Sequence, residues 1–356
     1  MEHVYAAIDT AIHDNRSFVV YRLPNDNKLR FVSATTEDAV QTFYDFNELN
    51  GQEGYIIAPF GISDECPIVC IQAEEVCWEY PEESPFTSSG EEYAEFAHIT
   101  PRYKKRFHTF MAAFHEWGMQ KLVLSRQLKM ERPPMFSPTE TFIKACYRYP
   151  NAYVYLFHTP VTGTWLGCTP ELLLEGEGSD WKAVALAGTQ PVIDGKVPTV
   201  WSEKNYEEQR FVSDYIYNQL QASGIATEEE GPFIVQAGEV AHLSSTFRFQ
   251  LPDNNYIGDL LQLMHPTPAV CGLPKEDAYW YIVDHEGYPR EYYSGFLGWL
   301  QPEGKTKLYM NLRCMQIGAK ILMLYAGSGL LPLSTADDEW METESKMQTL
   351  KAIINY

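Results

Sequence analysis

Apolar residues recur at helical spacing in three parts of the chain. In residues 101–117, aromatic side chains repeat at intervals of four and three positions, which places them on one face of a helix. Thr100 can cap that helix, the proline after it suits the first turn, and Gly118 can end it. The same kind of spacing predicts a second helix over about residues 206–222 and a C-terminal helix over about residues 337–353.

Short apolar runs separated by Gly, Asn and Asp turns predict strands in the rest of the chain. Because these strands are grouped in hairpins with helices interspersed, they favour an α+β fold over a doubly wound parallel sheet. Residues 79–92, rich in Pro, Glu, Ser and Gly, are expected to form an exposed loop. The expected strands are residues 17–22, 54–59, 121–126, 152–158, 164–167, 181–186, 291–300, 307–317 and 320–326.

Composition and charge narrow the class of protein. The 356 residues are 45% hydrophobic and 14% aromatic, which is ample for a sizeable core in one large domain or two ordinary ones. The formal net charge of −21 argues against non-specific nucleic-acid binding, which needs a basic surface. A site for an anionic ligand would therefore need a few local Lys or Arg residues or a metal ion.

The chain shows no sign of export or of a membrane span. No apolar run approaches the length that crosses a bilayer, and residues 1–16 lack a basic flank followed by an apolar run, so we expect a cytoplasmic protein. The seven cysteines are odd in number, which suggests reduced thiols. Cys66, Cys70 and Cys77 fit no zinc spacing, and the run around Cys70 is typical of a buried strand.

Two charged residues adjoin apolar runs. Lys121 opens the run LVLS, so it is either a strand-end lysine that reaches solvent or a desolvated lysine that acts as a general base. Glu171 precedes three leucines, where a carboxyl group tends to have a raised pKa and can serve as a general acid. The alternative is that Glu171 is a turn residue that points outward.

Carboxylates with helical spacing suggest a metal site. Glu339, Glu342 and Lys346 can share one helix face, and Glu208 lies near the start of the other helix. Three carboxylates from two helices could hold one Mg²⁺ through oxygen ligands and leave room for substrate and water. The alternative is a solvated helix face, which such spacing commonly marks.

Glycine turns and a strand arginine add candidate anion contacts. Residues 186–189 and 326–329 each follow an apolar run, and their backbone N–H groups could bind a carboxylate. Arg313 is expected inside an alternating strand and is suited to bidentate carboxylate recognition.

Taken together and in order, these segments resemble the chorismate-binding enzyme family over about residues 97–356. The family includes isochorismate and salicylate synthases and the large subunits of anthranilate and aminodeoxychorismate synthases. The matching segments are KLVLSR (121–126), TPELLL (169–174), LAGTQP (186–191), SEKNYEEQ (202–209), HL (242–243), HPTPAVCG (265–272), YYSGFLGWL (292–300), NLR (311–313), YAGSGLL (325–331) and EWMETESK (339–346).

The resemblance implies a fold and a role for each matching residue. It implies two face-to-face β-sheets flanked by helices in an α/β/β/α arrangement, with residues 1–95 a divergent N-terminal part and residues 96–356 the catalytic region. Lys121 resembles the general base and Glu171 the general acid. The residues that resemble Mg²⁺ ligands are Glu208, Glu339 and Glu342, and those that resemble substrate contacts are Thr189, His242, Tyr293, Arg313, Gly327, Gly329 and Lys346.

Two positions favour water over ammonia as the nucleophile. Members of the family that use ammonia typically carry Gln where this chain has Lys121, and aminodeoxychorismate synthases often carry Lys where it has Ala187. We therefore predict an isochorismate synthase, an isomerase that adds water at C2 of chorismate as the C4 hydroxyl leaves. Salicylate synthase, which goes on to eliminate pyruvate, remains an alternative, although Gln190 stands where those enzymes usually have Arg.

Asn205 and Gln209 replace the family's usual acid and His. These two substitutions leave room for a non-catalytic chorismate-binding regulator. An anthranilate synthase component I-like enzyme is a further alternative. The preferred interpretation implies no amidotransferase subunit and a monomer or weak homodimer. The product could feed menaquinone or siderophore biosynthesis.

Overall fold

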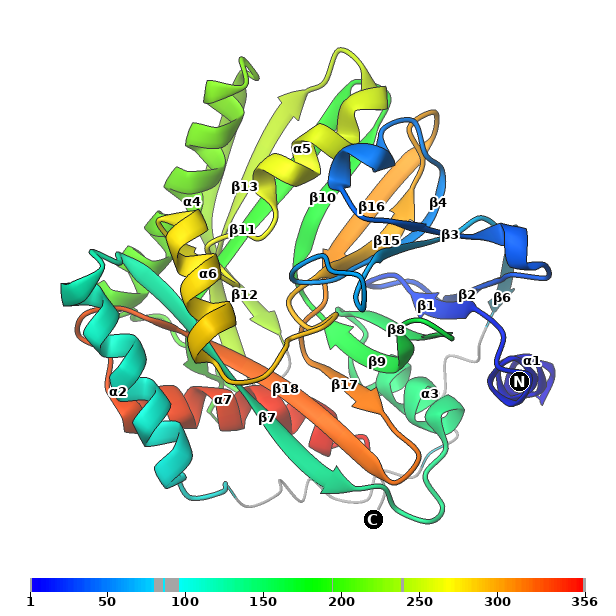
Figure 1. Ribbon diagram of the computed structural model, residues 1–356, viewed down its shortest axis with the longest axis horizontal. Coiled ribbons are helices and arrows are strands. Elements are labelled where there is room, and N and C mark those ends of the chain that lie inside the picture. Colours follow the sequence, from blue (N-terminus) through cyan, green and yellow to red (C-terminus); the bar gives the residue numbers. More distant parts are fainter. Residues whose placement is uncertain (1, 80–85, 87–95, 194, 238–239, 355–356) are drawn as a thin grey trace.

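The computed structural model describes residues 2–79, 86, 96–193, 195–237 and 240–354. Two nine-stranded sheets, antiparallel throughout, pack face to face, and helices cover their outer faces (Figure 1). The predicted α+β class and α/β/β/α layering are thus confirmed. Most of the loop expected over residues 79–92 lies outside the described residues, and Glu79 ends a strand.

Each sheet combines strands from the N-terminal and C-terminal parts of the chain. In order across the first sheet, the strands are β14 (Gly272–Leu273), β7 (Lys121–Glu131), β18 (Ile321–Leu330), β17 (Cys314–Ile317), β9 (Gly163–Thr169), β8 (Tyr153–Thr159), β1 (Phe18–Arg22), β2 (Lys28–Ser33) and β6 (Glu75–Glu79). In order across the second, they are β12 (Thr227–Ala237), β13 (Val240–Gln250), β11 (Asp180–Pro191), β10 (Leu172–Glu177), β16 (Lys305–Met310), β15 (Phe296–Leu300), β4 (Gly54–Ala58), β5 (Ile68–Ile71) and β3 (Val40–Phe43).

The helices form the outer layers. On the first sheet lie α1 (Glu2–His13), α3 (Pro138–Arg148) and α7 (Ala336–Lys351), and on the second lie α4 (Glu203–Ala222) and α5 (Ile257–Met264) (Figure 1). Two more helices, α2 (Pro101–Glu116) and α6 (Lys275–His285), pack together against β7. Short 3₁₀ turns are η1 (Glu37–Ala39), η2 (Phe46–Leu49) and η3 (Asn254–Tyr256).

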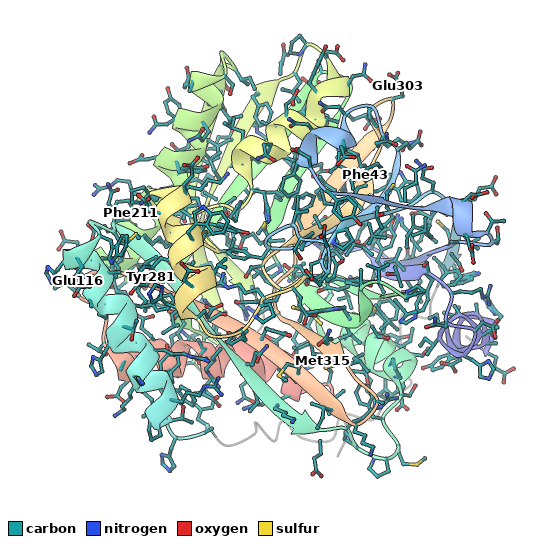
Figure 2. All side chains as sticks on the ribbon, in the orientation of Figure 1. Phe43, Glu116, Phe211, Tyr281, Glu303 and Met315 are labelled. Atoms are coloured by element: carbon teal, nitrogen blue, oxygen red, sulfur yellow. The ribbon has the colours of Figure 1, made fainter. Side chains whose placement is uncertain are left out.

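The three largest cores among the described residues follow from the alternation of side chains along the strands. In β8, Tyr153 and Tyr155 enter the core between the sheets, whereas Val154 and Leu156 enter the core beneath α3. Strands buried on both faces read as continuous apolar runs, which is how they could be predicted. The two outer cores are separate, and Figure 2 labels Phe43 in the core beneath α4 and α5 and Met315 in the core beneath α1, α3 and α7.

The predicted helix boundaries are close to those observed. Thr100 caps α2 through the N–H of Tyr103, and Gly118 adopts a φ of 67° just beyond its end. The aromatic stripe of α2 is buried except for Trp117, which is 63% exposed beyond the last turn. The helix expected at residues 206–222 begins three residues earlier, because Ser202 caps α4.

Two predicted strands are longer than the observed ones. Residues 291–295 form a turn before β15, and residues 311–313 form a second turn that separates β16 from β17. The prediction that Arg313 lies inside a strand is therefore wrong, because it lies in this turn with a φ of 47°. Asn311 fixes the two turns together by donating from its side chain to the carbonyl of Tyr292 at 2.7 Å.

All seven cysteines are free thiols, and Cys70 is buried in β5. Among the described residues, no group of three His, Cys, Asp or Glu side chains converges in a geometry that could hold a metal ion. No helix in the described part of the chain is long and apolar enough to cross a membrane.

Candidate active site

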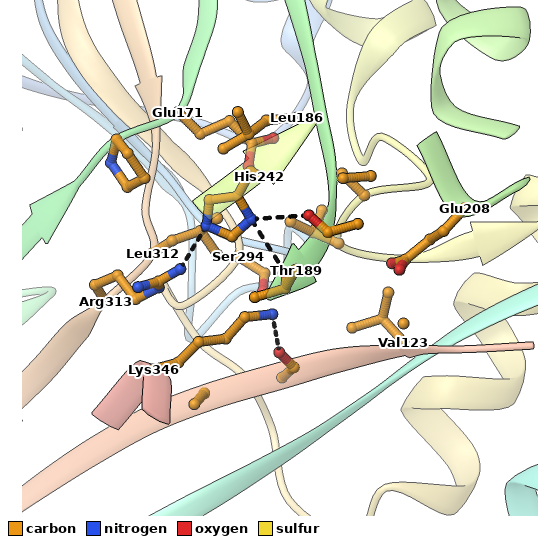
Figure 3. Close-up of a pocket in the computed structure, with 18 of the residues that line it drawn as sticks. Val123, Glu171, Leu186, Thr189, Glu208, His242, Ser294, Leu312, Arg313 and Lys346 are labelled. Atoms are coloured by element: carbon orange, nitrogen blue, oxygen red, sulfur yellow. Dashed lines mark hydrogen bonds between the residues drawn. The ribbon is translucent and has the colours of Figure 1, made fainter. Parts of the chain in front are cut away.

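A cavity opens where the two sheets meet α4 and α7. Nine of the twelve predicted site residues line it: Glu171, Thr189, Glu208, His242, Tyr293, Arg313, Gly327, Gly329 and Lys346 (Figure 3). The other three, Lys121, Glu339 and Glu342, do not line it directly. Each of these contacts another charged side chain at or beside the cavity.

Lys121 is the first residue of β7 and is completely buried. The interpretation of Lys121 as a strand-end lysine that reaches solvent is therefore wrong. Its Nζ lies 3.2 Å from Oε1 of Glu208, which does line the cavity. The Nζ atom makes no hydrogen bond of normal geometry to the described residues, so Glu208 is its main contact.

Glu171 faces the cavity from the turn before β10 and is 4% exposed. Burial raises the pKa of its carboxyl group to about 7, even though the charges of Lys121 and Lys346 act in the opposite direction. Glu171 is therefore substantially protonated near neutral pH. The alternative in which Glu171 points outward is wrong.

His242 on β13 holds the side chain of Arg313. Its Nδ1 lies 3.2 Å from the carbonyl of Gly188 and 3.2 Å from Oγ1 of Thr189, while Arg313 donates to its Nε2 at 3.0 Å (Figure 3). Burial first, and then the charge of Arg313, keep the pKa of His242 well below its usual range, so the imidazole is neutral. A neutral partner orients the guanidinium and leaves its positive charge available to a ligand.

Glycines make room for the charged side chains. A Cβ atom on Gly329 would lie 2.0 Å from Oε1 of Glu208, and one on Gly327 would lie 2.8 Å from the hydroxyl of Tyr293. Gly188 has a φ of 69° at a bulge in β11, next to Thr189. An added side chain at Gly327 or Gly329 would displace a cavity residue, and the backbone conformation of Gly188 favours glycine.

Lysines pair with all three predicted metal carboxylates. Besides the pair of Lys121 and Glu208, Lys346 donates to Glu342 at 2.7 Å and to the carbonyl of Gly327 at 2.8 Å. Lys204, near the start of α4, donates to Oε1 of Glu339 at 2.5 Å. The structure therefore shows the three carboxylates as neighbours of ammonium groups and not as a converged ligand set.

The acidic residues nevertheless have features that suit a cation. Oε2 of Glu339 is buried and accepts no hydrogen bond of normal geometry from the described residues. Burial, followed by the nearby charge of Glu342, raises the pKa of Glu339 above its usual range, although Lys204 opposes this. Carboxylate oxygens are the ligands that Mg²⁺ prefers, so an ion could satisfy this oxygen and offset the repulsion between the two carboxylates.

The structure explains the two departures from the family pattern. Gln209 points away from the cavity and donates to the carbonyl of Ala185 at 3.1 Å, which anchors α4 to the second sheet. Asn205 packs against Gly188, because a Cβ atom added to Gly188 would lie 2.8 Å from the carbonyl oxygen of Asn205. Neither residue is among those that line the cavity. The contacts of both are with other parts of the fold.

Two residues of the site were not singled out from the sequence. Ser294 lines the cavity and is completely buried with a φ of 65°, a conformation no local pattern announces. Lys204 pairs with Glu339 across two helices. One local signal could have drawn attention to it, because a lysine in the first turn of a helix opposes the helix dipole.

Comparison with known proteins agrees with the geometry. The family model described as "Chorismate binding enzyme" matches residues 72–355. Isochorismate synthase DhbC of Bacillus subtilis is 28% identical over 299 residues, which cover 78% of this chain and 75% of that protein. Isochorismate synthase EntC of Escherichia coli is 31% identical over 210 residues, which cover 56% of this chain and 54% of that protein.

A solved structure supports the same fold. The protein from Bacillus anthracis described as the 2,3-dihydroxybenzoate-specific isochorismate synthase DhbC superposes with a TM-score of 0.77 at 21% identity. The superposition covers 97% of this chain and 98% of that one, so it includes both sheets and the N-terminal strands. With the family model matched over most of its length, the chain belongs to the chorismate-binding enzyme family.

Proposed function

We propose that this protein is an isochorismate synthase, an isomerase that converts chorismate to isochorismate with the help of Mg²⁺. The observation that carries the proposal is a protonatable glutamate, Glu171, that lines the cavity of a chorismate-binding fold, together with a buried lysine, Lys121, that pairs with the cavity residue Glu208. The similar proteins named above are isochorismate synthases, which supports the same reaction.

Local charge suits a dianionic substrate in an acidic protein. Arg313 is buried at the cavity, its partner is a neutral imidazole, and Lys346 lines the same wall. Burial lowers the pKa of Arg313 to about 10, which still leaves it charged near neutral pH. These two cations can bind substrate carboxylates where the overall charge of the chain would repel them.

In the proposed reaction, Lys121 accepts a proton from a water molecule as the water oxygen bonds to ring carbon C2 of chorismate. An ammonium group cannot accept a proton, so Lys121 must first lose a proton, and its ion pair with Glu208 must open. The buried position of Lys121 excludes bulk water from the base.

Glu171 supplies the proton that the leaving hydroxyl needs. Its raised pKa keeps the carboxyl group protonated in part of the population near pH 7, so it can donate to the C4 oxygen as the C–O bond breaks. The proton taken by Lys121 and the proton given by Glu171 balance, and one water enters as another leaves.

Glu208, Glu339 and Glu342 would hold Mg²⁺. When bound, the ion would supply positive charge for the ring carboxylate of the substrate. The buried Oε2 of Glu339, which accepts no hydrogen bond of normal geometry from the described residues, is the structural feature that supports this assignment.

Product analysis tests the proposal. The purified protein is incubated with chorismate and Mg²⁺, with and without ammonium, and the products are separated by liquid chromatography. We expect isochorismate in both mixtures, in equilibrium with chorismate, and no turnover after chelation by EDTA. Ammonium-dependent anthranilate would contradict the proposal, as would release of pyruvate with salicylate as the main product.

A further inference from the structure

Lys204 has no role in the reaction described above, yet it contacts a residue of the predicted metal site. Its Nζ lies 2.5 Å from Oε1 of Glu339, and this contact joins the start of α4 to the start of α7. Glu339 is 1% exposed, whereas the side chain of Lys204 is 26% exposed. The lysine can therefore swing toward solvent, but the carboxylate cannot.

The position of Lys204 on its helix is electrostatically unfavourable by itself. Ser202 caps α4 through the N–H of Asn205, so Lys204 lies in the first turn, where the helix dipole favours anions. The carboxylates around Lys204 offset this unfavourable interaction, since the charges of Glu339, Glu208 and Glu342 all act on its ammonium group. The attraction of these acidic side chains therefore explains why a lysine is stable in the first turn of α4.

A counter-ion is needed when no metal is present. A buried carboxylate without a partner is costly, and Glu339 also lies close enough to Glu342 to be repelled by it. Lys204 engages only one oxygen of Glu339, and Oε2 accepts no hydrogen bond of normal geometry within the described part of the chain, although Ser334 lies near enough to favour the charged carboxylate. The Lys204–Glu339 pair is thus sufficient to keep the carboxylates together. Because the lysine satisfies only one oxygen of Glu339, a metal ion can replace it.

We propose that Lys204 is a displaceable counter-ion of Glu339 that holds the acidic cluster together without metal and competes with Mg²⁺ for it. Lys204 is a positioning residue that acts through Glu339, and the proposal rests on the Mg²⁺ site in the proposed function. Its consequence is that the resting cluster, with three carboxylates and three lysines, carries little net charge and binds Mg²⁺ only weakly until the anionic substrate is present.

Isothermal titration of the chorismate-free protein with MgCl₂ tests this directly. Removal of the competing ammonium in Lys204→Met should tighten Mg²⁺ binding about tenfold, within the range typical of coupling between two sites. Lys204→Arg, which keeps the charge, should retain an affinity close to that of the wild type. Unchanged or weaker binding in Lys204→Met overturns the proposal, and so does equal tightening in Lys204→Arg.

Lys104→Met is the matched control. It removes the same charge from an exposed pair with Asp337, two residues before Glu339, in which the atoms are 3.9 Å apart. We expect its Mg²⁺ affinity to stay within about twofold of the wild type, because exposed pairs are screened by solvent. A gain as large as that of Lys204→Met would show a general charge effect and overturn the proposal.

A measurement on folded protein with the native lysine guards against a variant that fails to fold. After reductive ¹³C-methylation, the methyl signal of Lys204, identified by its absence in Lys204→Arg, should shift as Mg²⁺ saturates the protein. An unshifted signal overturns the proposal. Mg²⁺ binding without isochorismate formation would contradict the proposed function and leave this inference in place, whereas no Mg²⁺ binding by any variant overturns this inference and the metal assignment.

Discussion

Two groups of buried ion pairs lie close together in this molecule and are built differently. One group joins helices to the first sheet through arginines, in the pairs Arg290–Glu286 and Arg126–Glu344. The other surrounds the cavity and uses lysines, in the pairs Lys121–Glu208, Lys204–Glu339 and Lys346–Glu342.

Both oxygens of each glutamate in the arginine pairs are engaged: Lys351 donates to the second oxygen of Glu344 at 3.1 Å, and Arg290 engages both oxygens of Glu286 by itself. Arg290 donates to both oxygens of Glu286 at 2.7 and 2.8 Å and to the carbonyls of Val270 and Val123 at 2.6 and 2.9 Å. Glu286 also accepts from the N–H of Ser125 at 2.7 Å. The planar fork of the guanidinium makes this possible, and the result is a fixed contact between α6, the segment after it and β7.

The lysine pairs are incomplete. Each joins one ammonium to one carboxylate oxygen, and both Nζ of Lys121 and Oε2 of Glu339 lack a hydrogen bond of normal geometry to the described residues. A point charge on a flexible stem can leave such a contact at lower cost than a bidentate fork. The difference indicates that the arginine pairs serve stability, whereas the lysine pairs can exchange partners.

The largest expected effect is on activity, from Lys121→Gln. Because glutamine cannot accept a proton, we expect the rate of isochorismate formation to fall about a thousandfold, within the usual range for a general base. Lys129→Gln, an exposed position on the same strand, should keep full activity. Retention of more than about a tenth of the wild-type rate by Lys121→Gln would remove Lys121 from its role.

The next effect is on stability, from Arg290→Met. This change leaves Glu286 buried and unpaired, and should lower the free energy of unfolding in urea by about 3 kcal/mol. Lys204→Met should cost less, about 1 kcal/mol, because the pKa of Glu339 is already raised and its carboxyl group can take up a proton when the lysine is lost. Equal losses in the two variants would erase the distinction between the two groups of pairs.

The pH dependence of kcat/KM reports on Glu171, a buried carboxyl group outside both groups of pairs. Its pKa of about 7 predicts a descending limb above pH 7, where the protonated acid falls about tenfold per pH unit. At lower pH, Glu171 remains protonated and does not limit the rate. A flat profile between about pH 6 and about pH 9 would contradict its role as general acid.

The smallest effect concerns Arg313, an arginine at the cavity whose partner His242 is neutral. His242→Glu would convert this contact into an arginine–glutamate ion pair like that of Arg290 and Glu286. Because the new carboxylate would offset the charge of the guanidinium, we expect KM for chorismate to rise about tenfold. His242→Gln, which adds no charge, should change KM much less. Steady-state kinetics at constant ionic strength distinguish the two outcomes.

Local sequence rules were sufficient for the elements and for the types of chemical residue. Thr100 and Gly118 mark the ends of α2 because capping depends on neighbours within a few positions. The same rules failed at Arg313, where the alternating pattern continues through a turn. The side chain of Asn311 holds that turn by a contact with Tyr292, nineteen positions away, and no local window contains both residues.

The sequence by itself determined the fold class, the family and the residues that gather around the cavity. Only the tertiary structure decided which acidic side chain pairs with which basic side chain. Lys121 could have reached solvent, but β7 starts within the protein and buries it against Glu208. Lys204 and Glu339 are 135 positions apart and meet only because the tertiary structure brings the first turns of α4 and α7 into contact. Ion pairing depends on distance in space and on burial, which spacing along the chain does not fix.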